Sequence, residues 1–149
     1  MVKQIIYLNT DGGSRGNPGP AGCGAVISDE QNKVLKKVSK FLGVATNNEA
    51  EYQAVILGLE TLKKMYGVDK LKEVEIVVRM DSELVCKQLN GEYQMKEEKL
   101  VPFFMKIWNM KVKDIPNVKF TYVPREQNSI ADGLANEAMD GSLKQDGLF

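Results

Sequence analysis

The chain has 149 residues, 43% of them hydrophobic and 27% charged, which fits one ordinary globular domain that can bury its own core. Its 20 Lys and Arg balance 20 Asp and Glu, which excludes the strong positive charge of proteins held on nucleic acid by bulk electrostatics. It contains no His, which excludes Ser-His-Asp or Cys-His catalysis and His-ligated zinc.

Three strands and a long helix are expected in the first half of the chain. The strands are expected at residues 3–9, 22–28 and 33–43. The short segment "DEQN" between the last two strands predicts a hairpin-type connection. Thr46 or Asn47 offers an N-cap for a helix from Glu49 onward, whose apolar residues recur at helical spacing. Gly67 is a natural residue to end that helix.

The second half predicts two further strands that return through helices. The expected elements are a strand at 73–80, helices at 82–89 and 99–113, a strand at 118–124 and a helix at 129–139. Pro102 fits the first turn of its helix, because the N–H that proline lacks would be unpaired there anyway. On the same helix we expect Trp108 to lie in the core with Phe104 and Ile107.

The order of these elements predicts an α/β fold, with a mixed five-stranded sheet flanked by helices. We expect residues 1–140 to form a single domain and residues 141–149 to form a flexible tail. No run of about 18 apolar residues exists, and "MVKQIIYLN" is too short and polar for a signal peptide. We therefore expect a cytoplasmic monomer with no membrane partner. Cys23 and Cys86 form no CxxC pair, and reduced thiols are the plain interpretation.

Four acidic residues fall where such a fold carries its sites. Asp11 is predicted to end the first strand and Asp81 the fourth, so two parallel neighbouring strands would bring both carboxylates to one edge of the sheet. Glu51 and Asp132 fall in the first turns of two helices, whose N-termini favour an anion. Taken singly, each acid is explained as a turn, capping or solvated residue. Their joint placement is what indicates a site.

A cluster of acids is unfavourable unless cations neutralise it. With oxygen ligands only, the cation that such a cluster selects is a hard one, Mg²⁺ or Mn²⁺. Two such ions about 4 Å apart clamp the attacking and leaving oxygens of a displacement at phosphorus. A P-loop is excluded, because "DGGSRGNPGPAG" lacks the GxxxxGK[ST] pattern and precedes a predicted strand rather than a helix.

Four motifs, in this order, resemble the ribonuclease H type 1 family: "TDGGSRGNPGPAGCGAVI", "TNNEAEYQAVILGLE", "MDSELVCKQLNGEY" and "VPREQNSIADGLANEA". The resemblance covers nearly the whole chain. It implies the ribonuclease H-like fold, with sheet order 3-2-1-4-5 and strand two antiparallel to the rest. It also implies metal-dependent hydrolysis of the RNA strand of RNA–DNA hybrids, which leaves 5′-phosphate and 3′-hydroxyl ends.

The resemblance assigns a role to each acid. Asp11 resembles the carboxylate that bridges two metal ions, and Glu51 the acid that binds one ion near the RNA 2′-OH. Asp81 resembles a ligand of the ion that activates the attacking water, and Asp132 the last and more mobile ligand. The family therefore implies two Mg²⁺ or Mn²⁺ ions in each site.

Other residues resemble family positions that contact the substrate. Those expected at the minor groove of the hybrid are Ser14, Asn17, Asn47 and Asn48. The 2′-OH distinguishes RNA from DNA there, and amide side chains suit it because they both donate and accept. Thr46 resembles a residue of the pocket that grips a DNA-strand phosphate, and Arg15 could meet a phosphate from the same loop. The alternatives are turn and capping chemistry for the amides and a solvated position for Arg15.

The chain departs from the family pattern in three places. The loop "PREQNS" has no His where many members carry one, and we expect activity to persist because the metals carry most of the chemistry. Residues 90–101, "NGEYQMKEEKLV", lack the basic, Trp-rich protrusion of some members, so we expect weaker and salt-sensitive binding. Glu83 stands where members often have Gln, and its charge could either hold metal or weaken contact with the nucleic acid.

The leading hypothesis is therefore an RNA–DNA hybrid endonuclease. One alternative is a nuclease of the same fold that acts on another substrate such as double-stranded RNA, because fold alone does not choose a substrate. A second alternative is a non-catalytic nucleic-acid-binding domain, which the presence of all four acids disfavours. A structural or interaction module would leave the four acids unexplained.

Overall fold

The computed structural model describes residues 4–147, which contain five strands and four α-helices. The strands are β1 (Ile5–Ser14), β2 (Gly19–Ser28), β3 (Val34–Ala45), β4 (Glu75–Met80) and β5 (Val118–Tyr122). The helices are α1 (Asn47–Leu71), α2 (Glu83–Leu89), α3 (Val101–Lys113) and α4 (Ser129–Gly147). Short 3₁₀ turns, η1 (Glu98–Leu100) and η2 (Arg125–Gln127), precede α3 and α4. Every expected element is present.

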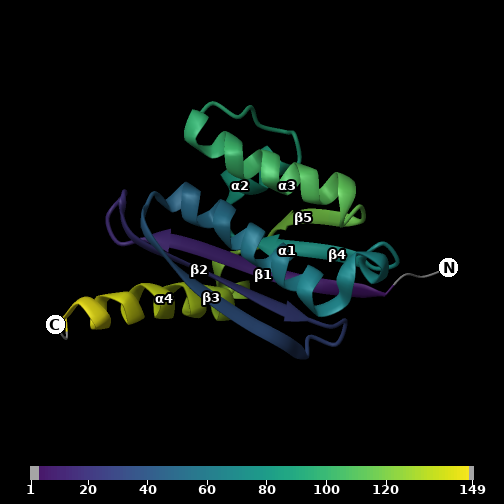
Figure 1. Cartoon of the computed structure of the whole chain (residues 1–149), viewed down its shortest axis with the longest axis horizontal. Helices are drawn as coiled ribbons and strands as arrows, with labels where there is room; N and C mark the ends of the chain where they lie inside the picture. Colours follow the sequence, from purple (N-terminus) through teal and green to yellow (C-terminus); the bar gives the residue numbers. More distant parts are fainter. Residues whose placement is uncertain (1–3, 148–149) are drawn as a thin grey trace.

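The strands form one sheet in the order β3-β2-β1-β4-β5 (Figure 1). β2 is antiparallel to both of its neighbours, whereas β1, β4 and β5 run parallel. The expected strand order and the antiparallel second strand are thus confirmed. The parallel strands are joined through helices, as the geometry of parallel connections requires.

Helices cover both faces of the sheet. A Cβ added to Gly12 would lie 2.7 Å from the backbone N of Glu51, so this position of β1 faces α1. Successive strand residues point to opposite faces, and Gly13 faces Met139 in α4. α4 lies along β2 and β3, apart from the other three helices (Figure 1). Within residues 4–147, none of the helices combines the length and apolarity needed to cross a membrane.

The main hydrophobic core lies between the sheet and α1, α2 and α3. Its fully buried members include Ile6, Leu8, Leu59, Leu62, Ile76 and Val78. Cys23 and Cys86 are both buried and unpaired, as expected.

The start of α1 is held by a capping box. The Thr46 hydroxyl accepts a hydrogen bond from the Glu49 backbone N, and the Glu49 carboxylate accepts one from the Thr46 backbone N. Of the two expected N-caps, Thr46 is therefore the one used. Gly67 interrupts the helix with φ 80° and ψ 160°, a left-handed φ that glycine adopts without strain, and a short helical segment then continues to Leu71.

Several expected boundaries were wrong, most clearly the ends of β1 and α4. β1 continues through Ser14, so residues 11–14, expected in a loop, are paired with residues 21–24 of β2. α4 continues to Gly147 instead of ending at residue 139, because a single glycine such as Gly141 weakens a helix without ending it. The expected tail is thus helical as far as residue 147. Its flexibility stays a prediction, and residues 148–149 lie outside the described part.

The expected burial of Trp108 was also wrong. Trp108 is 51% exposed, whereas its neighbour Ile107 is 1% exposed. Ile107 and Met110 are the buried residues of α3, and Trp108 lies about 100° further round the helix from Ile107. Phe104 is partly buried against the core.

Candidate active site

Asp11 and Asp81 are brought together by the register of two parallel strands. Thr10 of β1 is paired with Met80 of β4, and this is the last pair of the ladder. Asp11 is the residue after Thr10 in β1, and Asp81 is the first residue after the end of β4. The expected meeting of these two acids at one edge is therefore confirmed. Asp11 differs from the expectation in lying within a strand, because β1 continues past β4 as the partner of β2.

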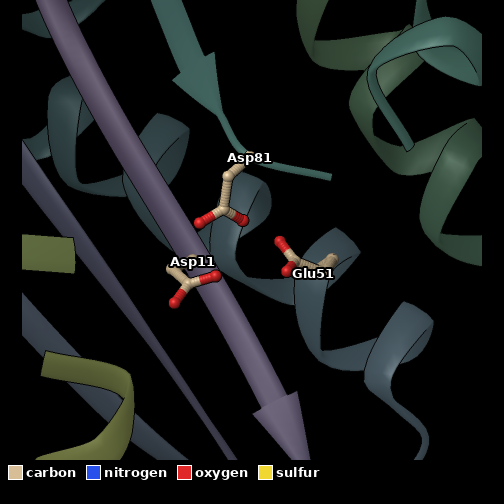
Figure 2. Close-up of side chains that lie close together, drawn as sticks. All are labelled: Asp11, Glu51 and Asp81. Atoms are coloured by element: carbon tan, nitrogen blue, oxygen red, sulfur yellow. The ribbon is translucent and has the colours of Figure 1, made fainter. Parts of the chain in front are cut away.

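Glu51 joins them from the first turns of α1. The absence of a side chain at Gly12 lets this end of α1 lie directly against β1. Ligand oxygens of Asp11, Glu51 and Asp81 all lie within 4.8 Å of one another. Figure 2 shows these three carboxylates converging from β1, α1 and the end of β4.

Asp132 lies at the rim of the same site and outside this group of three. α4 carries it there by packing on β2 at Gly22 and Gly24, where an added Cβ would lie within 3 Å of α4. The Asp132 carboxylate accepts a 3.4 Å hydrogen bond from Arg125 Nη2 and a 3.5 Å one from Asn136 Nδ2. It lines the same cavity as Asp11, and its interaction with Asp11 is among the causes that raise the pKa of the Asp11 carboxyl group. The structure thus gathers three of the four predicted acids tightly and places the fourth beside Asp11.

Asp11 and Glu51 stand in an unfavourable environment for negative charge. Asp11 is 6% exposed, and its burial, followed by the charge of Asp81, raises its pKa to about 7. Burial, followed by the charges of Asp11 and Asp81, also raises the pKa of Glu51 well above its ordinary value. A cation bound among these oxygens would favour the ionised carboxylates and so lower the pKa values of Asp11 and Glu51. The donor set consists of carboxylate oxygens alone, which fits a hard divalent ion.

A cavity of about 380 Å³ opens over the carboxylates. Its polar and glycine lining consists of Asp11, Gly12, Gly13, Ser14, Arg15, Asn47, Glu51, Asp81, Arg125, Asp132 and Asn136. Three of the six predicted substrate contacts, Ser14, Arg15 and Asn47, therefore line the cavity. Asn17, Thr46 and Asn48 lie close to it in the chain without lining it.

The predicted contact residues also hold the loop between β1 and β2 against α1. The backbone N of Ser14 donates to Asn47 Oδ1 at 2.9 Å, and the backbone N of Asn47 donates to Asn17 Oδ1 at 2.9 Å. The Thr46 hydroxyl serves the capping box, and Asn48 Nδ2 donates to Glu97 Oε1 at 3.4 Å. The alternative of turn and capping chemistry thus accounts for part of what these side chains do.

Arg15 reaches from this loop to α4. Its Nη2 lies 2.7 Å from Asp140 Oδ1 and 3.5 Å from Asn136 Oδ1, and its side chain is 42% exposed. The sequence prediction missed Asn136, which follows Asp132 by one helical turn. That spacing on a predicted helix was the available signal.

Known proteins are similar to this chain in sequence and in fold. A family model described as reverse transcriptase-like matches residues 9–138. A bifunctional protein of Mycobacterium tuberculosis and ribonuclease HI of Halobacterium salinarum are each 38% identical, over 93% and 91% of this chain. The chain spans only 36% and 64% of the length of these two relatives. The solved structure of LC11-RNase H1 in complex with an RNA/DNA hybrid has a TM-score of 0.89 and 49% identity, covering 93% of this chain and 99% of that one.

Proposed function

The chain belongs to the ribonuclease H type 1 family, and from this membership we propose that it is a metal-dependent endonuclease that hydrolyses the RNA strand of RNA–DNA hybrids. The products would be 5′-phosphate and 3′-hydroxyl ends. The observation that carries the proposal is the cluster of Asp11, Glu51 and Asp81, whose oxygens lie within 4.8 Å of one another under an open cavity. LC11-RNase H1, which is similar over nearly its whole length, was solved with an RNA/DNA hybrid bound.

The acids would hold two Mg²⁺ or Mn²⁺ ions. Bound in a pair, such ions supply Lewis-acid stabilisation to the attacking and leaving oxygens of a displacement at phosphorus. Asp11 has the central place in this proposal, since Glu51, Asp81 and Asp132 all lie close to it. Glu51 and Asp81 would each complete the site of one ion, and Asp132 would be the last ligand, positioned from the rim.

The chain's other residues would bind and orient the hybrid. Ser14 and Asn47 line the cavity, and Asn17 and Asn48 would join them in recognising sugar hydroxyls and base edges. Thr46 would contribute to a DNA-strand phosphate pocket. Arg15 and Arg125 are the two cationic side chains of the cavity lining, so they are the candidates for phosphate contact. With a net charge of zero, the protein would bind the hybrid weakly, and added salt would weaken that binding further.

The protein would act as a monomer in the cytoplasm. One chain supplies all three clustered carboxylates and the rim acid, so the site needs no second copy. Size-exclusion chromatography with light scattering would test the oligomeric state.

A panel of substrates tests the proposed activity. The protein is incubated with a labelled RNA–DNA hybrid, double-stranded RNA, double-stranded DNA and each single strand, with Mg²⁺, Mn²⁺ or EDTA. We expect cleavage of the hybrid's RNA strand with either metal and none in EDTA. Preferential cleavage of double-stranded RNA would indicate a nuclease with that substrate instead of the hybrid. Hybrid binding without any cleavage would indicate a non-catalytic domain.

A further inference from the structure

A chain of side-chain hydrogen bonds runs beneath the acids on the α4 face of the sheet. Arg79 Nε donates to Asn9 Oδ1 at 3.0 Å, and Asn9 Nδ2 donates to Asn128 Oδ1 at 3.0 Å. Asn128 Nδ2 in turn donates to the backbone O of Thr10 at 2.9 Å. Asn128 is 1% exposed, so its amide has little access to solvent water. We call Arg79, Asn9 and Asn128 the relay.

Each member of the relay is close in sequence to one of the site acids. Asn9 precedes Asp11 by two residues in β1, so the two lie on the same face of the sheet, and Arg79 of β4 precedes Asp81 by two residues. The third member, Asn128, accepts a 3.0 Å hydrogen bond at its backbone O from the backbone N of Asp132. The relay therefore ties the start of α4 to the two central strands.

The direction of the relay is set by its two ends. Arginine can only donate and a backbone carbonyl can only accept. Asn9 must therefore turn its oxygen toward Arg79 and its NH₂ group toward Asn128, and Asn128 must turn its NH₂ group toward Thr10. A single arrangement of both amides satisfies every partner.

Arg79 is itself held in place. Its guanidinium carbon lies 4.0 Å from the centroid of the Tyr7 ring, on the same face of β1 as Asn9. Within the described part of the chain Arg79 forms no ion pair with a carboxylate. Stacking on Tyr7 and donation to Asn9 are therefore the contacts that position it.

We propose that Arg79, Asn9 and Asn128 are positioning residues, which hold the first turn of α4 so that Asp132 stands beside Asp11 and can complete the metal site. This inference rests on the proposed function, and it deepens the account of that same site. Residues that orient metal ligands from behind affect metal affinity or activity by about 10- to 100-fold when they are replaced.

Two substitutions break the relay in different ways. Arg79→Met removes the donor at one end and keeps an apolar chain over Tyr7. Asn9→Asp gives Arg79 a carboxylate partner, which favours folding, but an ionised carboxylate cannot donate to Asn128. Both changes make the surroundings of the acids more negative, so simple electrostatics would strengthen cation binding. The relay predicts the opposite.

The experiment compares the wild type with Arg79→Met, Asn9→Asp and Arg79→Lys, which keeps a donor-only cation. Lys119→Met is the matched control, because it removes an exposed cation from β5 whose ion-pair partner is Glu75. Titration calorimetry measures the Mn²⁺ affinity, and circular dichroism measures the unfolding midpoint. Cleavage assays on the hybrid give kcat and KM. We expect Arg79→Met and Asn9→Asp to weaken Mn²⁺ binding and lower kcat by about tenfold each with KM little changed. Arg79→Lys should keep most of the wild-type Mn²⁺ affinity and kcat, and Lys119→Met should match the wild type in both quantities.

Unchanged Mn²⁺ affinity and kcat in Arg79→Met and Asn9→Asp would overturn the relay, even if their unfolding midpoints fell. That outcome would leave the proposed function standing, since the wild type would still cleave the hybrid. If the wild type does not cleave it, the proposed function fails, and the Mn²⁺ titrations still decide whether the relay positions the metal site. If one variant fails to fold, the other decides.

Discussion

Asp11 is paired with Gly24 across the antiparallel ladder of β1 and β2. The missing side chain of Gly24 is what lets α4 lie on the sheet there, because an added Cβ would lie 2.5 Å from the Cβ of Leu134 and 2.9 Å from the backbone O of Ala131. Asp132 lies between these two contacts in the sequence. The residue opposite the central acid thus determines how closely the fourth acid approaches it.

Gly24→Ala should therefore push α4 away from the sheet. We expect the free energy of unfolding to fall by about 1–3 kcal/mol, because the new methyl group meets helix backbone that cannot move aside easily. We also expect kcat to fall, since Asp132 moves with the helix. Gly133→Ala is the control on α4 itself, where nothing lies within 4 Å, and it should stabilise the helix by up to about 1 kcal/mol. Equal stability of the two variants in urea titrations would contradict this packing account.

The pKa of Asp11 leads to a prediction about metal-free protein. Its folded-state pKa is raised to about 7, so between about pH 4 and 7 the unfolded state has lost a proton that the folded state keeps. Stability should therefore fall as pH rises through this window, and the raised pKa of Glu51 acts in the same direction. Asp11→Asn should not lose the stability that the wild type loses when Asp11 ionises. In EDTA above neutral pH it should therefore be more stable than the wild type, by an amount on the order of 2 kcal/mol.

Asp69→Asn, at an exposed position of α1, is the control for this prediction. Thermal unfolding of the three proteins is measured across this pH range. If the wild type is no less stable than Asp11→Asn above pH 7, the predicted direction of the pH dependence is wrong.

Divalent metal should reverse that loss. Metal binds the deprotonated carboxylates, so saturating Mg²⁺ should raise the unfolding midpoint of the wild type strongly at about pH 8 and little at about pH 5. Asp11→Asn should show a much smaller rise at about pH 8. A rise of the same size in both proteins would mean that Mg²⁺ acts elsewhere on the chain.

Sequence patterns predicted most of this fold because the strands and helices follow local periodicity. Asp11, Glu51 and Asp81 could be placed together because the predicted strand ends and helix starts, with the strand order that the family resemblance implies, determine their positions. The exposure of Trp108 was not predicted, because one step around α3 decides whether its side chain faces the core. The relay of Arg79, Asn9 and Asn128 was also beyond sequence patterns, since the hydrogen bond between the last two joins residues 119 positions apart in the chain.

Arg15 offers a test of how the hybrid is held. If it contacts a phosphate, Arg15→Ala should raise KM several-fold with kcat unchanged, and the slope of log KM against log salt should fall by about 1. Asp140→Asn is the matched change at the other end of the 2.7 Å ion pair, and it should leave KM unchanged or lower it by freeing Arg15. If both variants lower the unfolding midpoint and neither changes KM, Arg15 only fastens the β1–β2 loop to α4.

The central claim is that Asp11, Glu51 and Asp81 carry metal-dependent cleavage of RNA in a hybrid. The most direct measurement is cleavage of an RNA–DNA hybrid, labelled on the RNA strand, by the wild type, Asp11→Asn and Asp69→Asn with saturating Mg²⁺. We predict that the wild type and Asp69→Asn cut the RNA strand and leave 5′-phosphate ends, and that Asp11→Asn cuts at least about 1,000-fold more slowly, a loss of about 4 kcal/mol in transition-state stabilisation. Cleavage by Asp11→Asn at the wild-type rate, or cleavage by the wild type in EDTA, would contradict the claim.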